Sequence, residues 1–414
     1  MSTLLLKNAR LFDGFNENCP ENAQVFIENG TIREVSEKAI AATSDTVIDC
    51  GGRFLMPGLI DAHVHAYASD VNLQKVDLAG EPYRTAHAVR MLGFALDSGF
   101  TTVRDIGGGD YPLWRAIEDR LIRAPRYLYA GKIISMTGGH GDLRTMNVSN
   151  HTHGYCSCGS SNTFSVMADG VDECVKATRE ELRRGSHCIK IMGSGGVASP
   201  TDPIWMDQFR EDEIRAIVEE TKKRRTYTSA HCHPTSAVRR CVEYGVRVIE
   251  HGTLIDDETA RYVAAQNDTY IIPTMAIIFA LMEMGPRLGF PPASQEKVKQ
   301  VAQQAFTGME SMRRAGVRIG LGTDLLGETY TQQSREFALR KEVFSPLEIL
   351  RQATSTNAAI LQREGKLGCI APGAHADLLV VDGDPLKNIE LLAASGKHLR
   401  LIMRAGEIVR NELK

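Results

Sequence analysis

Two histidines end an apolar stretch of this 414-residue chain. The stretch covers residues 55–65, and it carries His63 and His65 with one residue between them. Alternate side chains of a β-strand face the same way, so both imidazoles would project together. A pair of imidazoles at a strand end is a suitable start for a divalent-metal site. Taken alone, the pair is explained equally well by strand histidines that bond nearby backbone.

Further residues able to bind a metal lie in or at the ends of later predicted strands. They are Lys190, His231, His251 and Asp324. Taken singly, each has a simpler explanation, because a histidine can pack in the core and an aspartate can cap the next segment. The carboxyl ends of the strands of a β/α barrel meet at one mouth, however. Together these residues therefore predict a shared metal shell.

Lys190 is the most diagnostic of them. It lies between Ile189 and Ile191, so its ammonium group is predicted to be buried. Burying an unpaired charge is costly, whereas a neutral lysine avoids that cost and becomes reactive. Reaction with CO₂ would convert Lys190 into a carbamate, whose oxygens can bridge two cations. The alternative is an ion pair with Asp105 or Glu250.

Strands and helices alternate between residues 58 and 369. The helices are predicted at residues 84–98, 171–184, 211–223, 236–244, 257–266 and 294–315, and the last strand at residues 317–324. Eight strands alternating with helices predict a closed (β/α)₈ TIM barrel. A doubly wound open sheet is the alternative, but its ligands would cluster at one switch point.

Both ends of the chain contain short strands with alternating apolar residues. Residues 1–57 and 370–414 are predicted to form one small β-sandwich domain, which leaves residues 58–369 for the barrel.

The formal charge is −3, from 48 basic and 51 acidic residues, so neither a nucleic-acid nor a membrane partner is expected. No segment resembles a signal peptide or a membrane-spanning helix. The nine cysteines are an odd number, which suits reduced thiols better than a set of disulfides. The chain is therefore expected to be cytoplasmic.

Two long connections, residues 135–169 and 193–209, are expected on the active-site face. His140 follows Gly138 and Gly139 in the first of them, where glycines permit a close backbone approach. His233 shares the strand parity of His231. Both His140 and His233 are therefore candidates for substrate contact, although His140 is also explained by a loop histidine in solvent.

Several motifs resemble those of the amidohydrolase superfamily. They are residues 57–65, the Lys190 strand, His231, residues 249–252, residues 322–324 and residues 372–378. More narrowly, residues 137–140, 189–196 and 199–203 resemble the prolidase-like (Xaa-Pro dipeptidase) branch. They also resemble a sister branch that removes basic C-terminal residues. The resemblance spans nearly the whole chain and implies a homo-oligomer with a small-molecule or dipeptide substrate.

The resemblance also implies a site with two divalent metal ions, for which Zn²⁺ suits the ligands best. The ligands would be His63, His65 and Asp324 for one ion, His231 and His251 for the other, and N6-carboxylysine at Lys190, formed with CO₂, as the bridge. A hydroxide held between the ions would attack the scissile carbonyl. Asp324 would take its proton and pass it to the departing amine.

The expected reaction is hydrolysis of Xaa-Pro dipeptides, with His140 polarising the carbonyl or holding the oxyanion. Prolidase-like relatives usually have a tyrosine where this chain has His233, so the substrate preference does not carry over directly. The alternatives are release of C-terminal Arg or Lys, a deaminase or cyclic amidohydrolase on the same scaffold, and a non-enzymatic relative. Lys190 argues against a mononuclear deaminase, and the six occupied ligand positions argue against a non-enzymatic relative.

Overall fold

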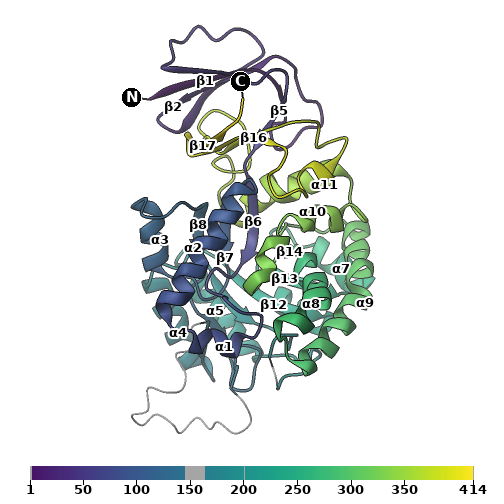
Figure 1. Cartoon of the computed structure of the whole chain (residues 1–414). Coiled ribbons are helices and arrows are strands. Elements are labelled where there is room, and N and C mark those ends of the chain that lie inside the picture. Colours follow the sequence, from purple (N-terminus) through teal and green to yellow (C-terminus); the bar gives the residue numbers. More distant parts are fainter. Residues whose placement is uncertain (1, 145–163, 200, 414) are drawn as a thin grey trace.

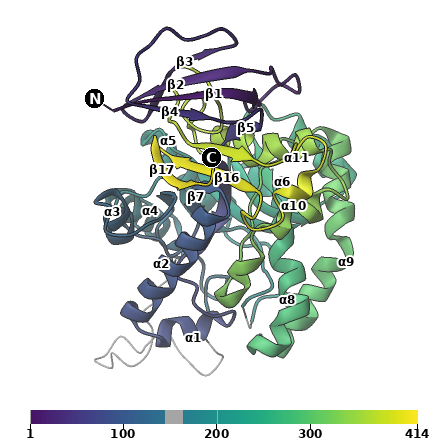
Figure 2. The same cartoon turned by 45° about the horizontal axis from the view of Figure 1, so that its top comes forward.

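The protein is described from a computed structural model that covers residues 2–144, 164–199 and 201–413. Both ends of the chain lie in one mixed β-sheet, at the top of Figure 1. The parallel strands lie below it, with helices around them. Figure 2 brings the mixed sheet forward and shows strands from the two ends of the chain side by side.

The mixed sheet contains eight strands, in the order β17-β16-β15-β5-β1-β2-β3, with β4 paired to β1. Its strands are β1 (Thr3–Leu11), β2 (Ala23–Glu28), β3 (Thr31–Ser36), β4 (Thr46–Asp49), β5 (Phe54–Pro57), β15 (Leu378–Val381), β16 (Leu399–Arg404) and β17 (Glu407–Asn411). The antiparallel pairing of β5 with β15 joins the two ends of the chain. The sandwich arrangement and the boundaries at residues 57 and 370 stay predictions.

The remaining strands form two parallel sheets that carry the candidate ligands. One is ordered β6-β7-β8 and the other β10-β9-β11-β12-β13-β14. Their bounds are β6 (Leu59–Val64), β7 (Phe100–Asp105), β8 (Arg126–Tyr129), β9 (Ile133–Ser135), β10 (Ser165–Met167), β11 (Ile189–Met192), β12 (Thr228–Pro234), β13 (Val248–Leu254) and β14 (Tyr270–Ile272). Most of their residues are buried, as expected for parallel strands covered by helices.

The helices follow the strands in alternation. They are α1 (Leu73–Leu78), α2 (Glu81–Asp97), α3 (Tyr111–Glu118), α4 (Val171–Arg183), α5 (Glu211–Lys223), α6 (Thr235–Glu243), α7 (Asp257–Ala264), α8 (Met275–Leu288), α9 (Pro292–Ala315), α10 (Arg335–Arg340), α11 (Pro346–Arg351) and α12 (Asn357–Ile360). The prediction missed α8, which begins three residues after β14 ends. Within the described residues, no helix has the length and apolarity to cross a membrane.

The predicted strand at residues 317–324 is not a regular strand. It forms one parallel bridge, between Ile319 and Ile271 of β14. The Gly320 N–H donates to the Ile271 carbonyl (2.9 Å), and the Ala62 N–H of β6 donates to the Leu321 carbonyl (3.0 Å). The segment departs from extended geometry at its end, because Asp324 has φ +57°. The prediction of a regular strand is therefore wrong, although the segment lies between β14 and β6.

Asn357 ties this segment to β6. Its fully buried side chain donates to the carbonyls of Ile60 (2.6 Å) and Leu321 (2.8 Å) and accepts from the Leu321 N–H (3.1 Å). An Asn357→Ala variant would leave these buried groups without partners, so its free energy of unfolding should fall by about 2–4 kcal/mol. Urea denaturation measures this fall, with the exposed Asn18→Ala as control. Equal midpoints for the two variants would contradict the role given to Asn357.

Candidate metal centre

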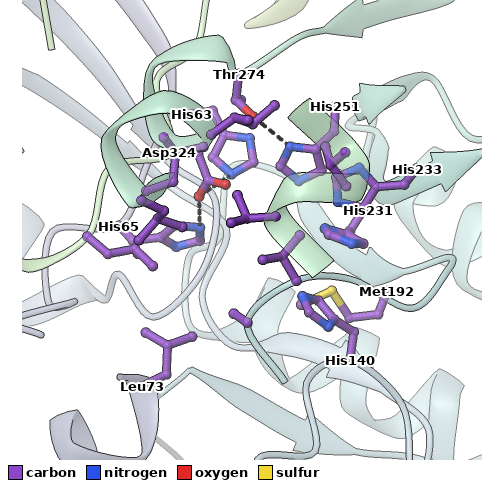
Figure 3. Close-up of a pocket in the computed structure, with 18 of the residues that line it drawn as sticks. His63, His65, Leu73, His140, Met192, His231, His233, His251, Thr274 and Asp324 are labelled. Atoms are coloured by element: carbon purple, nitrogen blue, oxygen red, sulfur yellow. Dashed lines mark hydrogen bonds and ion pairs between the residues drawn. The ribbon is translucent and has the colours of Figure 1, made fainter. Parts of the chain in front are cut away.

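The eight side chains singled out from the sequence line one cavity of about 100 Å³. They are His63, His65, His140, Lys190, His231, His233, His251 and Asp324. They come from β6, β11, β12, β13, the loop after β9 and the segment after α9. Figure 3 shows the six histidines and Asp324 pointing toward a common space.

His63, His65 and Asp324 form the tightest group. One ligand atom from each lies within 4.8 Å of the others. The Nε2 atoms of both histidines are 3.2 Å from Asp324 Oδ1 (Figure 3). Burial alone would raise the pKa of Asp324, but the two neighbouring rings hold it well below its usual range. The group therefore presents two imidazoles and a carboxylate to one point.

The partners of the Nδ1 atoms of His63 and His65 show that the Nε2 atoms face Asp324. His63 Nδ1 is 2.8 Å from Glu250 Oε2, and His65 Nδ1 is 2.9 Å from the Gly107 carbonyl oxygen. Both partners only accept, so each Nδ1 carries the proton and a neutral ring has its lone pair on Nε2. Two lone pairs and a carboxylate then converge. Such acceptors repel unless a proton or cation lies between them, so this group fits a divalent metal ion.

The Glu250 carboxylate bonds other partners than Lys190. Its carboxylate accepts from Arg104 (2.6 Å) and from the Ser229 hydroxyl, in addition to His63. Although burial favours the neutral acid, Arg104 and His63 hold the pKa of Glu250 below its usual range. Asp105, the other partner considered for Lys190, accepts from Tyr127 and the Ala66 N–H. Neither carboxylate forms the ion pair with Lys190 that was the alternative explanation for this lysine.

The Lys190 side chain is 1% exposed and has no hydrogen bond or ion pair with any other described residue. Burial lowers the pKa of Lys190, because water no longer solvates the ammonium group. Burial outweighs the attraction of Glu250 and Asp324 for the ammonium group, and so shifts Lys190 toward the neutral amine. This is the form that reacts with CO₂. The position therefore suits carbamate formation better than a structural ion pair.

His231 and His251 lie on the adjacent strands β12 and β13, with ring centroids 4.6 Å apart. His231 Nε2 is 3.3 Å from the Gly195 carbonyl, which leaves Nδ1 as its free nitrogen. His251 Nδ1 is 2.7 Å from Thr274 Oγ1 (Figure 3), which leaves Nε2 free. Burial lowers the pKa of both rings well below the usual value. Both are therefore neutral, the form in which histidine binds metals.

His140 and His233 lie beside the β12 histidine. The ring of His140 stacks on His231 at 4.4 Å between centroids, and that of His233 is 4.8 Å from it. His140 Nδ1 contacts the buried Asp202 Oδ2 at 3.1 Å, and His233 Nδ1 contacts Thr253 Oγ1 at 3.2 Å. In both rings Nε2 is the nitrogen left for a ligand. The described residues thus place both predicted substrate contacts at the cavity.

The sequence did not predict how the loop over the cavity is fixed. Lys297 of α9 donates to the carbonyls of Gly196 (3.0 Å), Ser199 (3.0 Å) and Asp202 (2.5 Å). A Cβ on Gly196 would lie 2.5 Å from Nε2 of both His140 and His231, so this position needs glycine. The Gly195-Gly196 pair was a visible signal of a close approach. The lysine, which lies about 100 residues further along the chain, was not.

The comparisons agree with this geometry. A model of the amidohydrolase family matches residues 54–409. Ochratoxinase of Aspergillus niger is 31% identical over 350 residues, which cover 81% of this chain and 72% of that protein. A solved amidohydrolase superposes with a TM-score of 0.96 at 45% identity and covers 100% of both chains. A solved prolidase complexed with N-methylphosphonate-L-proline gives 0.95 at 39% identity, over 99% of this chain and 100% of that one.

A family match across most of the chain, together with these relatives, establishes the class of enzyme. The chain belongs to the amidohydrolase superfamily, in its prolidase-like branch, and is a hydrolase of amide or peptide C–N bonds.

Proposed function

We propose that this protein is a two-metal hydrolase that cleaves Xaa-Pro dipeptides. The observation that carries the proposal is that free ring nitrogens, Asp324 and a buried Lys190 without an ion-pair partner among the described residues line one cavity. Similarity to a solved prolidase over nearly the whole chain supports the substrate class. The carboxypeptidase alternative would need an anion for a basic side chain. Among the described lining residues, Asp324 is the only carboxylate, and it is committed to the metal group.

His63, His65 and Asp324 would hold one ion, His231 and His251 the other, and carboxylated Lys190 would bridge them. Imidazole nitrogens with carboxylate oxygens suit Zn²⁺. When bound, the ions supply a water molecule with a lowered pKa and polarise the scissile carbonyl. Glu250 and the Gly107 carbonyl hold the protons of His63 and His65 on Nδ1, which would leave each Nε2 for an ion.

Three side chains of the protein, Asp324, His140 and His233, would then transfer protons and orient the substrate. Asp324, an ionised carboxylate facing the cavity, accepts the proton of the attacking water and returns it to the departing amine. The Asp202 carboxylate accepts the proton on His140 Nδ1, so Nε2 would donate a proton to the carbonyl oxygen only from the doubly protonated ring. His233 presents Nε2 to the substrate from the strand that carries His231.

We also propose that the parallel strands close into a (β/α)₈ barrel. The hydrogen bonds of residues 317–324 support this, because the segment bonds β14 on one side and β6 on the other. A second join is indicated where the His187 N–H, just before β11, donates to the Tyr129 carbonyl of β8 (2.8 Å). Closure would bring the ends of β6, β12 and β13 to one mouth, as the cavity requires.

Replacing the bridging lysine tests the two-metal site. Wild-type protein produced with CO₂ and Zn²⁺ should contain about two ions per chain, and Lys190→Ala fewer, because the bridging ligand is lost. The variant should lose activity by at least about 10³-fold, equivalent to about 4 kcal/mol. Metal analysis and dipeptide hydrolysis measure the two effects, with the exposed Lys176→Ala as control. One ion per wild-type chain, or full activity in Lys190→Ala, would contradict the two-metal mechanism.

A dipeptide panel tests the substrate class. Dipeptides with C-terminal Pro, Arg, Lys, Leu and Phe are incubated with the metal-loaded enzyme, and the released amino acids are quantified. Release of proline should exceed release of arginine and lysine by at least about tenfold in kcat/KM, because no described anion outside the metal group lines the cavity. Preferred release of arginine or lysine would favour the carboxypeptidase alternative. Release from none would favour the deaminase or cyclic amidohydrolase.

A further inference from the structure

A second cavity lies on the outer side of the loop that follows β7. Its volume is about 350 Å³, which lies within the range of about 300–1,000 Å³ that is usual for small-molecule sites. Its walls come from the loops after β7 and β8, the starts of α2 and α3, and the last turn of α4. These elements carry none of the candidate metal ligands, so this second cavity has no role in the proposed mechanism.

The loop after β7 separates the second cavity from the metal centre. The Gly107 carbonyl bonds His65 on the inner side, whereas the next two residues line the second cavity. Asp105 fixes this loop, because its Oδ1 atom accepts from the N–H groups of Gly107 (3.1 Å) and Gly109 (3.2 Å). No described residue lines both cavities. A ligand in the second cavity would therefore lie outside the metal centre.

The charged side chains that line the second cavity are balanced in sign. They are Glu81, Asp110 and Glu181, and Arg84, Lys132 and Arg184. A simple anion or a simple cation would therefore meet like charges as well as opposite ones. A zwitterion, which carries an ammonium and a carboxylate group a few bonds apart, can pair both of its charges. The balance of charge thus favours a zwitterionic ligand.

Two carboxylates face the second cavity with incomplete hydrogen bonding. Glu181, which is 4% exposed, accepts from the Lys132 backbone N–H at Oε2 (3.1 Å). Its Oε1 atom is 3.9 Å from Arg184 Nη1, beyond hydrogen-bond distance. Asp110 accepts from the Tyr67 hydroxyl at Oδ1 (3.1 Å), and no described residue donates to its Oδ2. Burial raises the pKa of both carboxyl groups, so an added ammonium group would stabilise their ionised forms.

We infer that the second cavity binds an α-amino acid. The ammonium group of the ligand would donate to Asp110 and Glu181, and its carboxylate would accept from Arg184. Hydrolysis of peptide bonds releases molecules of this class, so the products of the enzyme are one source of the ligand. The inference goes beyond the proposed function, because it concerns a site outside the metal centre and is tested by binding alone.

Equilibrium dialysis tests the ligand class on the metal-loaded enzyme. Radiolabelled L-alanine is compared with acetate and ethylammonium, each of which carries one of its two charges. L-Alanine should bind at least about tenfold more tightly than either, because only the zwitterion forms charge-assisted hydrogen bonds with both sets of residues. Equal affinities for the three probes would overturn the inference, as would the lack of saturable L-alanine binding.

Two variants test the place of binding. Arg184→Gln and Glu181→Gln should each weaken L-alanine binding at least about tenfold, because each removes one charged partner. Arg183→Gln and Glu180→Gln are the matched controls, since these neighbours on α4 form an exposed ion pair and should bind L-alanine as the wild type does. Metal content and the thermal midpoint check that the variants fold.

The Arg184 side chain is 41% exposed, so Arg184→Gln keeps the test valid if Glu181→Gln does not fold. L-Alanine bound at the metal centre would be unaffected by this variant. Wild-type affinity in folded Arg184→Gln would therefore assign the binding to the metal centre and overturn the inference. The proposed function would stand in that case, because dipeptide hydrolysis is measured separately.

Discussion

The centre of this protein depends on the buried carboxylate of Glu250. It accepts hydrogen bonds from Arg104 on β7, His63 on β6 and Ser229 on β12, and so joins three strands to its own β13. The same bonds have two chemical consequences. They fix the proton of His63 on Nδ1, and they occupy a carboxylate with which Lys190 could otherwise pair. One ion pair thereby makes a histidine ready to bind a metal and leaves a lysine ready for carbamate formation.

The loop over the cavity supports both the candidate metal ligands and part of the apolar lining. Lys297 holds residues 196–202 against α9, and within this loop Asp202 orients His140. The Gly195 carbonyl selects the free nitrogen of His231. The apolar lining of the cavity continues from Val197 and Ala198 of this loop onto Ile277 of α8 and Val298 of α9. An apolar lining strengthens electrostatic interactions at the site, because little water screens them. The same loop thus supports both the candidate ligands and the lining of the cavity.

The sequence predicted best what depends on short spacing. The i, i+2 histidines of β6 and the parity of His231 and His233 needed only the period of a strand. The lysine between two isoleucines predicted its own burial. The sequence did not predict how the loop over the cavity is fixed, because this depends on contacts between residues far apart in the chain. Nothing local links Lys297 to Ser199.

The missed helix α8 and the wrongly predicted strand before Asp324 each have a physical reason. α8 follows Thr274 without a side-chain cap and continues through Gly285 and Pro286, residues that usually mark the end of a helix. The segment before Asp324 has the composition of a strand, but its positive φ and its bonds to β6 are set by tertiary contacts with His63. The amphipathic helix α5, with an acidic first turn and a basic last turn, was predicted with its observed bounds.

The most direct test of the two-metal account is anomalous diffraction at the zinc edge from crystals grown with Zn²⁺ and bicarbonate. The account predicts two anomalous peaks, one contacting His63, His65 and Asp324 and the other contacting His231 and His251. Electron density on Lys190 should extend to both. A single peak at full zinc occupancy, or two peaks with an unmodified Lys190, would contradict it.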